Sequence, residues 1–173
     1  FAPNSRSIVA IDLGTDRLMA FRLDQERGTL SPAATPWTKL PPGTGPRHLA
    51  FHPHRPLAYV ISELQSTVTV CRYDGEQGAF APFQTVSTLP DGFTGENLGA
   101  EIMVAPSGRF VYASNRGHDS VAICRGLERS QWHDAARLER LREGRLGRFL
   151  QEAGQHVAYY RDLFASRGFR PQP

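Results

Sequence analysis

Five residues with complementary chemistry fall at the edges of strand-like segments. Arg47 and His48 close the run GTGPRH, Glu101 opens the apolar run EIMV, and Glu63 and Arg116 each follow a segment that contains a tyrosine. An arginine can grip a phosphate or a carboxylate at two points, and a histidine exchanges protons most easily near neutral pH. Together, these groups can polarise a carbonyl, hold an anion and activate water.

Each of these residues also has an ordinary structural explanation. Arg47 can be an exposed cation, His48 a structural histidine, and Glu101 a surface charge at a strand end, since a carboxylate is costly to bury without a partner. Glu63 and Arg116 stand at the same place of two similar segments. An acid in one segment and a base in the other favours a polar site over a merely stabilising position.

Two further residues are candidate substrate contacts. Asp12, in AIDLG, takes a corresponding position in an earlier segment, and His118 follows Arg116 in a turn. We expect no metal site, because FHPHRP places His52 and His54 close together without a third ligand at a suitable spacing. The chain has no G-x-S-x-G nucleophile motif.

The elements that must position these residues are repeated in the sequence. Residues 46–71 and 99–124 are similar when one is shifted by about 53 residues, which aligns Tyr59 with Tyr112 and Cys71 with Cys124. A repeat of this length is typical of four-stranded propeller blades. Function in a propeller lies at the central channel, which equivalent positions of successive blades line.

The two parts of the chain have different patterns. Up to residue 124, short apolar and β-branched runs alternate with Gly, Pro, Asp and Asn, which indicates strands joined by turns. The expected strands are Ser7–Asp12, Arg17–Leu23, Arg47–Phe51, Ala58–Ile61, Thr67–Tyr73, Glu101–Val104, Phe110–Ala113 and Ser120–Cys124. After Gly126, leucines such as Leu138 and Leu141 recur at helical spacing between charged residues. We therefore expect an all-β domain at 1–124 and an α-helical tail at 125–173.

Composition narrows the function classes. The net charge of +3 comes from basic residues after residue 124, which is typical of a solvated helix face, so we expect no nucleic-acid partner. No apolar run approaches the ~20 residues of a membrane span, and the first residues do not have the pattern of a secretory signal. The two cysteines lie inside strand-like runs, where we expect small buried side chains. A cytoplasmic location follows from these features.

Four runs in the first part resemble the seven-bladed propeller lactonases, the family of bacterial 6-phosphogluconolactonase. These runs are DLGTDR, GTGPRHLAFHP, YVISELQSTVTV and AEIMVAPSGRFVYASNRGHDSVAI. The resemblance covers roughly residues 5–123 and implies about two to three blades of a seven-bladed ring. It implies hydrolysis of a sugar lactone, 6-phosphogluconolactone above all, in the pentose phosphate pathway, with no metal or organic cofactor.

The resemblance also implies site residues. His48 in GPRH, Glu101 in AEI and Arg116 in SNR are the catalytic candidates, and Arg47 and Glu63 are their neighbours or ligand contacts. Either Glu101 or His48 is the base that activates water. A carboxymuconate-type lactonizing cycloisomerase and a non-catalytic binding platform are the alternatives. Because a partial array of blades leaves apolar faces uncovered, we expect the chain alone to be marginally stable and inactive.

The tail is similar to a different family. Trp132, the Leu-Arg helix and the run HVAYYRDLF resemble the N-terminal leader of phenylacetate–CoA ligase-like adenylate-forming proteins. None of that family's nucleotide-binding loops is present, so the resemblance implies no ligase activity. We expect the tail to be unrelated to the propeller, or fused to it.

Overall fold

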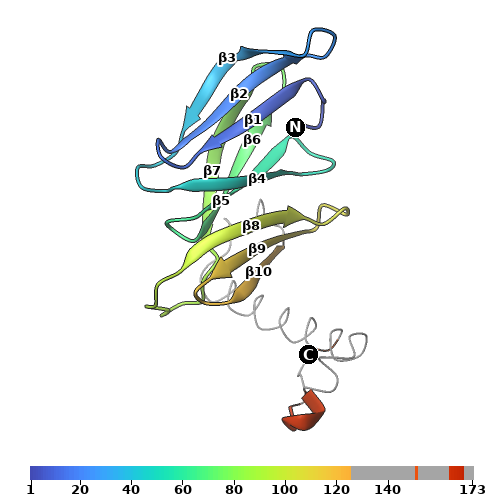
Figure 1. The fold of residues 1–173 in the computed structure, drawn as a ribbon. Coiled ribbons are helices and arrows are strands. Elements are labelled where there is room, and N and C mark those ends of the chain that lie inside the picture. Colours follow the sequence, from blue (N-terminus) through green and yellow to red (C-terminus); the bar gives the residue numbers. More distant parts are fainter. Residues whose placement is uncertain (126–150, 152–163, 170–173) are drawn as a thin grey trace. The chain divides into compact units, whose positions relative to one another are not determined.

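The computed structural model of the chain describes residues 1–125, 151 and 164–169. Residues 1–125 form one four-stranded and two three-stranded antiparallel sheets, in which consecutive strands are neighbours (Figure 1). The strands are β1 (Ser7–Asp12), β2 (Arg17–Asp24), β3 (Thr29–Lys39), β4 (Pro46–Phe51), β5 (Leu57–Ser62), β6 (Thr67–Asp74), β7 (Ala79–Ser87), β8 (Leu98–Val104), β9 (Phe110–Arg116) and β10 (Ser120–Arg125). This arrangement confirms the predicted all-β class and the partial propeller of two to three blades.

The chain divides into two compact units, Phe1–Glu128 and Arg129–Pro173. In the second unit, Gln151 and residues 164–166 are helical. Most of the expected helical tail, including Leu138 and Leu141, lies outside the described residues. The helical tail, the domain boundary near residue 124 and the separate origin of the tail therefore stay predictions.

Two strands, β3 and β7, were not expected from the sequence. Both lie at the edge of their sheets, β3 next to β2 and β7 next to β6. Pro32 in β3 and Pro82 in β7 interrupt the apolar alternation that predicts strands. An edge strand tolerates proline because one side of its backbone makes no ladder hydrogen bonds. Proline, which kept these two strands from being predicted, is therefore a residue that an edge strand tolerates.

The hairpins that follow β1, β5 and β9 are built alike. In each, four residues lie between a closing pair, and the last of the four has a positive φ of 51–56°. The closing pairs are Asp12↔Arg17, Ser62↔Thr67 and Asn115↔Ser120, and the positive-φ residues are Asp16, Ser66 and Asp119. This match of turns fixes which residues of the three sheets are equivalent.

The hydrophobic core lies between neighbouring sheets. One cluster joins Leu18 of the first sheet to Val60 of the second, and the other joins Tyr59 and Ile61 of the second to Val111 of the third. All six residues of β5 are buried because sheets cover both of its faces. This burial explains why LAYVIS is a continuous apolar run without polar alternation.

Cys71 and Cys124 form no disulfide and lie at equivalent places of the second and third sheets. Cys71 is buried between sheets, and burial raises the pKa of its thiol to about 12. Cys124, in β10, is partly exposed. Within the described ranges, no helix has the length and apolar character needed to cross a membrane.

Candidate active site

The first strands of the second and third sheets, β4 and β8, contact each other and carry the same irregularity. In β4 the pairing with β5 passes from Pro46 to His48, so Arg47 is an extra residue. In β8 the regular pairing with β9 is interrupted between Gly99 and Ile102, next to Glu101. A bulge of this kind re-aims side chains and is frequent beside active sites. It therefore sets the directions of Arg47, His48 and Glu101.

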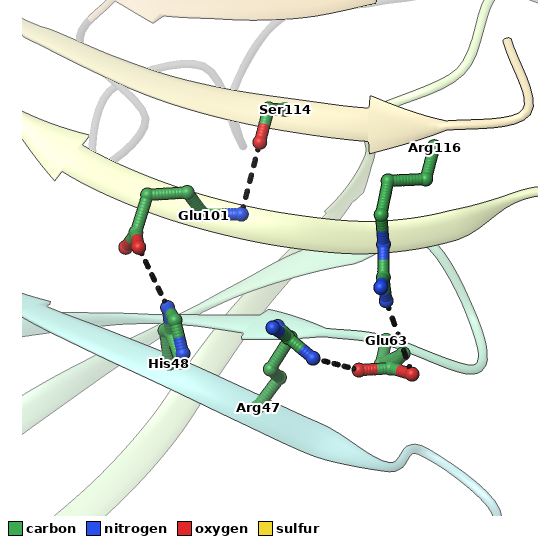
Figure 2. Close-up of polar contacts among 6 residues, drawn as sticks. All are labelled: Arg47, His48, Glu63, Glu101, Ser114 and Arg116. Atoms are coloured by element: carbon green, nitrogen blue, oxygen red, sulfur yellow. Dashed lines mark hydrogen bonds and ion pairs between the residues drawn. The ribbon is translucent and has the colours of Figure 1, made fainter. Parts of the chain in front are cut away.

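His48 and Glu101 face each other from the two sheets (Figure 2). Nδ1 of His48 lies 2.9 Å from Oε2 of Glu101, and the two side chains are 40% and 57% exposed. The Glu101 backbone N–H donates to Oγ of Ser114, and Oε1 of Glu101 accepts the N–H of Ile102 at 2.9 Å. The pair is thus fixed in place yet open to a ligand.

The electrostatic environment keeps Glu101 ionised. Desolvation by partial burial raises the pKa of its carboxyl, but the hydrogen bonds from His48 and Ile102 outweigh this effect, together with the charges of His48 and Arg47. The net result is a pKa below the ordinary value. A carboxylate of low basicity suits the role of orienting an imidazole better than that of taking a proton from water.

Glu63 joins the other two candidates. It lies just after β5, and its Oε2 is 2.6 Å from Nη1 of Arg47 while its Oε1 is 3.1 Å from Nη2 of Arg116 (Figure 2). Arg116 belongs to β9, so the second ion pair links neighbouring sheets. The hydrogen bond from Arg47 is the largest effect that lowers the pKa of Glu63; desolvation opposes it, and the charge of Arg116 adds to it.

The structure therefore brings five of the seven predicted site residues together as two ion-paired groups. We call Arg47, His48, Glu63, Glu101 and Arg116 the polar cluster. Its members come from two adjacent sheets, and both links between the sheets join residues at equivalent repeat positions. Unlike charges of successive repeats therefore meet at this place.

The other two predicted residues do not contact the polar cluster in the described part of the chain. Asp12 accepts hydrogen bonds from the N–H groups of Gly14 and Thr15 and from the Thr15 hydroxyl, which lower the pKa of its carboxyl. Its turn position matches Ser62, so Leu13 takes the place equivalent to Glu63. Asp12 thus lies one residue away from the position that the sequence comparison gave it.

His118 is held by its own hairpin and by the segment that precedes β8. Its Nδ1 lies 2.7 Å from Oγ of Ser120, and its ring meets Phe93 edge-on with centroids 4.8 Å apart. Its backbone N–H donates to Oδ1 of Asn97. These contacts give His118 a structural place in the turn, and its role toward a substrate stays a prediction.

Sequence reasoning missed Asp16, the last residue of the turn between β1 and β2. Its Oδ2 accepts the N–H of Gly43 at 2.8 Å, and its Oδ1 accepts the N–H of Gly45 at 2.7 Å. These glycines belong to the GTGPRH run that leads to Arg47. The signal was a second acidic residue in a turn already noted for Asp12, but its partners lie far along the chain.

The described residues contain no group of three or more His, Cys, Asp or Glu side chains that could hold a metal ion. The polar cluster itself offers an imidazole, two carboxylates and two guanidinium groups. These can move a proton, stabilise an oxyanion and bind an anionic group of a ligand.

Comparison with known proteins identifies the family of this propeller. Residues 1–137 match the family described as "Lactonase, 7-bladed beta-propeller". The chain belongs to this lactonase family. It is 43% identical over 123 residues to the 6-phosphogluconolactonase of Bacillus subtilis strain 168, a match that covers 71% of this chain and 34% of that protein. It is 36% identical over 120 residues to the 6-phosphogluconolactonase of Erwinia tasmaniensis, covering 69% of this chain and 36% of that one.

Solved structures of lactonases have the same fold. The periplasmic gluconolactonase PpgL of Pseudomonas aeruginosa matches with a TM-score of 0.68 and 31% identity, over 75% of this chain and 36% of that one. A putative 6-phosphogluconolactonase from Bacteroides fragilis matches with a TM-score of 0.63 and 32% identity, over 73% and 36%. The chain spans about a third of the length of these lactonases. The sequence resemblance to the lactonase family is thus confirmed.

Proposed function

We propose that the propeller to which these blades belong hydrolyses a sugar lactone, with 6-phosphogluconolactone as substrate and 6-phosphogluconate as product. The observation that carries this proposal is the exposed His48–Glu101 pair beside two arginines that Glu63 holds. The lactonase family and the similarity to 6-phosphogluconolactonases support the reaction class. A phosphorylated substrate suits the two guanidinium groups.

His48 is the base in this proposal. Glu101 binds Nδ1 of the imidazole and leaves Nε2 to accept a proton from water. The water oxygen then forms a bond to the lactone carbonyl carbon, and the charge that develops on the carbonyl oxygen is stabilised by a guanidinium group. When the ring C–O bond breaks, the imidazolium returns its proton to the leaving alkoxide, which gives a carboxylic acid and a hydroxyl group.

Arg116 and Arg47 supply the positive charge. Each guanidinium has five N–H donors, so donors remain after the contacts with Glu63. Glu63, whose side chain is 16% exposed, uses both oxygens on the arginines. It therefore acts in this proposal as the residue that holds the two guanidinium groups rather than as a direct ligand contact.

The assay follows proton release on ring opening. Residues 1–125 are put in place of the matching third of the Bacillus subtilis relative, which gives a completed propeller. The unaltered relative is the positive control. We expect the completed propeller to open 6-phosphogluconolactone faster than gluconolactone. We expect the 173-residue chain alone not to exceed the spontaneous rate, because it spans about a third of such a ring.

The same assay separates the alternatives. A folded completed propeller without turnover on either lactone would contradict the proposal and favour a binding platform. Ring closure of a carboxymuconate in place of lactone opening would favour the cycloisomerase. The cytoplasmic location expected from the thiols stays a prediction, and the Pseudomonas relative is described as periplasmic.

A further inference from the structure

We infer that Asp16 is a positioning residue that sets the place of Arg47 and His48 although it touches neither. The first observation is a two-point contact across sheets. The Asp16 carboxylate, in the first sheet, accepts the N–H groups of Gly43 and Gly45 through separate oxygens, at 2.8 and 2.7 Å. Its own carbonyl accepts the N–H of Leu40 at 2.9 Å. Asp16 thus holds both ends of the connection from β3 to β4.

Gly45 passes this constraint to the polar cluster. Its φ is +58°, and its carbonyl accepts the N–H of Glu63 at 2.7 Å. A side chain at this position would collide with Leu64, because an added Cβ would lie 2.4 Å from Leu64 Cγ. Pro46 follows, with its φ fixed by the ring, and Arg47 and His48 come next. Few free torsions therefore separate the Asp16 contact from the two side chains.

The next sheet repeats the device, which argues that it serves the site. Ser66 has the turn position of Asp16, with φ of +51°. Its carbonyl accepts the N–H of Thr88 at 2.9 Å, and its Oγ accepts a hydrogen bond from Nδ2 of Asn97 at 2.7 Å. Asn97 stands directly before β8, the strand of Glu101. In both cases the last turn residue of one sheet holds the linker that leads to a site residue of the next.

An ionised carboxylate suits the position of Asp16. Two N–H groups point at it, and only a carboxylate offers two oxygens that both accept. The hydrogen bonds from Gly45 and Gly43 are the largest effects on its carboxyl and lower its pKa. An asparagine at this place would turn an NH₂ group toward one of the two donors. The positioning role is a matter of structure; its importance for catalysis rests on the proposed lactone hydrolysis.

The test compares Asp16→Asn with Asp12→Asn in the full 173-residue chain, labelled for NMR. Asp12 is the matched control, because it closes the same turn and its carboxylate accepts hydrogen bonds from Gly14 and Thr15 of that turn. We expect Asp16→Asn to speed amide exchange at Gly45 by about tenfold or more. We expect it also to move the titration of the Glu101 carboxyl upward, because His48 no longer sits against it. Asp12→Asn should change neither readout.

An unchanged Glu101 titration and unchanged Gly45 exchange in folded Asp16→Asn protein would overturn the inference. If Asp16→Asn does not fold, Asp16→Ser takes its place, because serine is the residue type that the second sheet has at this position. Faster Gly45 exchange and a raised Glu101 titration in this variant support the inference, and no change in either overturns it. Neither readout depends on turnover. Failure of the lactone assay alone therefore contradicts the proposed reaction and leaves the positioning role of Asp16 to the NMR result.

Discussion

His48 of β4 and Glu101 of β8 stand 53 residues apart in the sequence and 2.9 Å apart in space, Nδ1 to Oε2. They occupy the same position of neighbouring sheets. His48 directly follows the bulge of β4, and Glu101 lies within the equivalent bulge of β8. The repeat has therefore diverged at this position into a histidine in one sheet and a glutamate in the next. The pair is formed between two sheets, and neither sheet carries it alone.

This pairing predicts unequal effects of two substitutions in the completed propeller. His48→Gln removes the proposed base, and we expect kcat for 6-phosphogluconolactone to fall by about 10²–10⁴-fold. Glu101→Gln keeps a group that can orient the ring, so we expect a smaller fall. Initial rates of proton release measure both effects. His54→Gln is the control, because His54 contacts the Pro106 carbonyl and not the polar cluster. A His48→Gln protein with undiminished kcat would refute the assignment.

Glu63→Gln tests the residue that holds the two arginines. Loss of the negative charge weakens the contacts to Arg47 and Arg116. We expect KM for the phosphorylated lactone to rise about tenfold, with a smaller change for the unphosphorylated one, and the free energy of unfolding to fall by about 1 kcal/mol. Steady-state kinetics and urea unfolding measure the two effects. The exposed Glu76→Gln serves as the control. Equal KM changes for both lactones would show that the arginines do not bind the phosphate.

The repeat explains how much of this site could be predicted. Because blades repeat, aligning residues 46–71 with 99–124 placed His48 opposite Glu101 and Glu63 opposite Arg116 before any coordinates. The alignment could not resolve the earlier turn, where the strand pairing puts Leu13 and not Asp12 at the position of Glu63. Single-residue register is decided by hydrogen bonding between strands, which the short run AIDLG does not reveal.

Asp16 and the edge strands mark what the sequence pattern could not show. The Asp16 contacts join a side chain to backbone N–H groups 27 and 29 residues away, and such contacts leave no periodicity in the sequence. Strands β3 and β7 have prolines and exposed residues, and each is the edge strand of its sheet in the described part of the chain. The hydrophobic pattern of a sequence reflects how its strands are buried and paired. Strands that are less buried and pair on one side are therefore missed.

The acidic members of the cluster predict how stability changes with pH. The folded-state pKa values of Glu63 and Glu101 are lowered from the ordinary value of 4.5. Their stabilising effect is thus complete above the unfolded pKa and is lost as the pH falls through the folded pKa. We expect the free energy of unfolding to be steady from about pH 7 to 5 and to decline below about pH 4.5. Urea unfolding across this range measures it, and Glu63→Gln should flatten the decline. A decline as steep in this variant as in the parent would contradict the role of Glu63.

The two thiols should react very differently. Burial removes Cys71 from reagents and raises its thiol pKa to about 12, whereas Cys124 is partly exposed. With a thiol reagent at pH 8, we expect one fast modification at Cys124 and modification of Cys71 only after denaturation. Mass spectrometry of the modified peptides identifies the site. Cys124→Ser is the control and should leave the native chain almost unlabelled. Rapid labelling of Cys71 in that variant would mean that the two sheets do not stay packed.

Gly99 tests the contact that brings the sheets of the site together. Its N–H donates to the carbonyl of Glu63 at 2.9 Å, and an added Cβ would lie 2.4 Å from the backbone oxygen of Ser62. Because that oxygen belongs to the buried strand β5, we expect Gly99→Ala to push β8 away and to lower the free energy of unfolding by about 1–3 kcal/mol.

Gly14→Ala is the matched control for this substitution. A Cβ on Gly14 meets only Oδ1 of Asp12 at 3.6 Å, an ordinary contact, so we expect a change within about 0.5 kcal/mol. Urea unfolding of both variants measures the difference. Because β8 carries Glu101, the Gly99 variant should also shift the titration of the Glu101 carboxyl upward, as its hydrogen bond to His48 lengthens. Equal stability of the two variants, with Glu101 unchanged, would mean that β8 and β5 do not approach as closely as this contact requires.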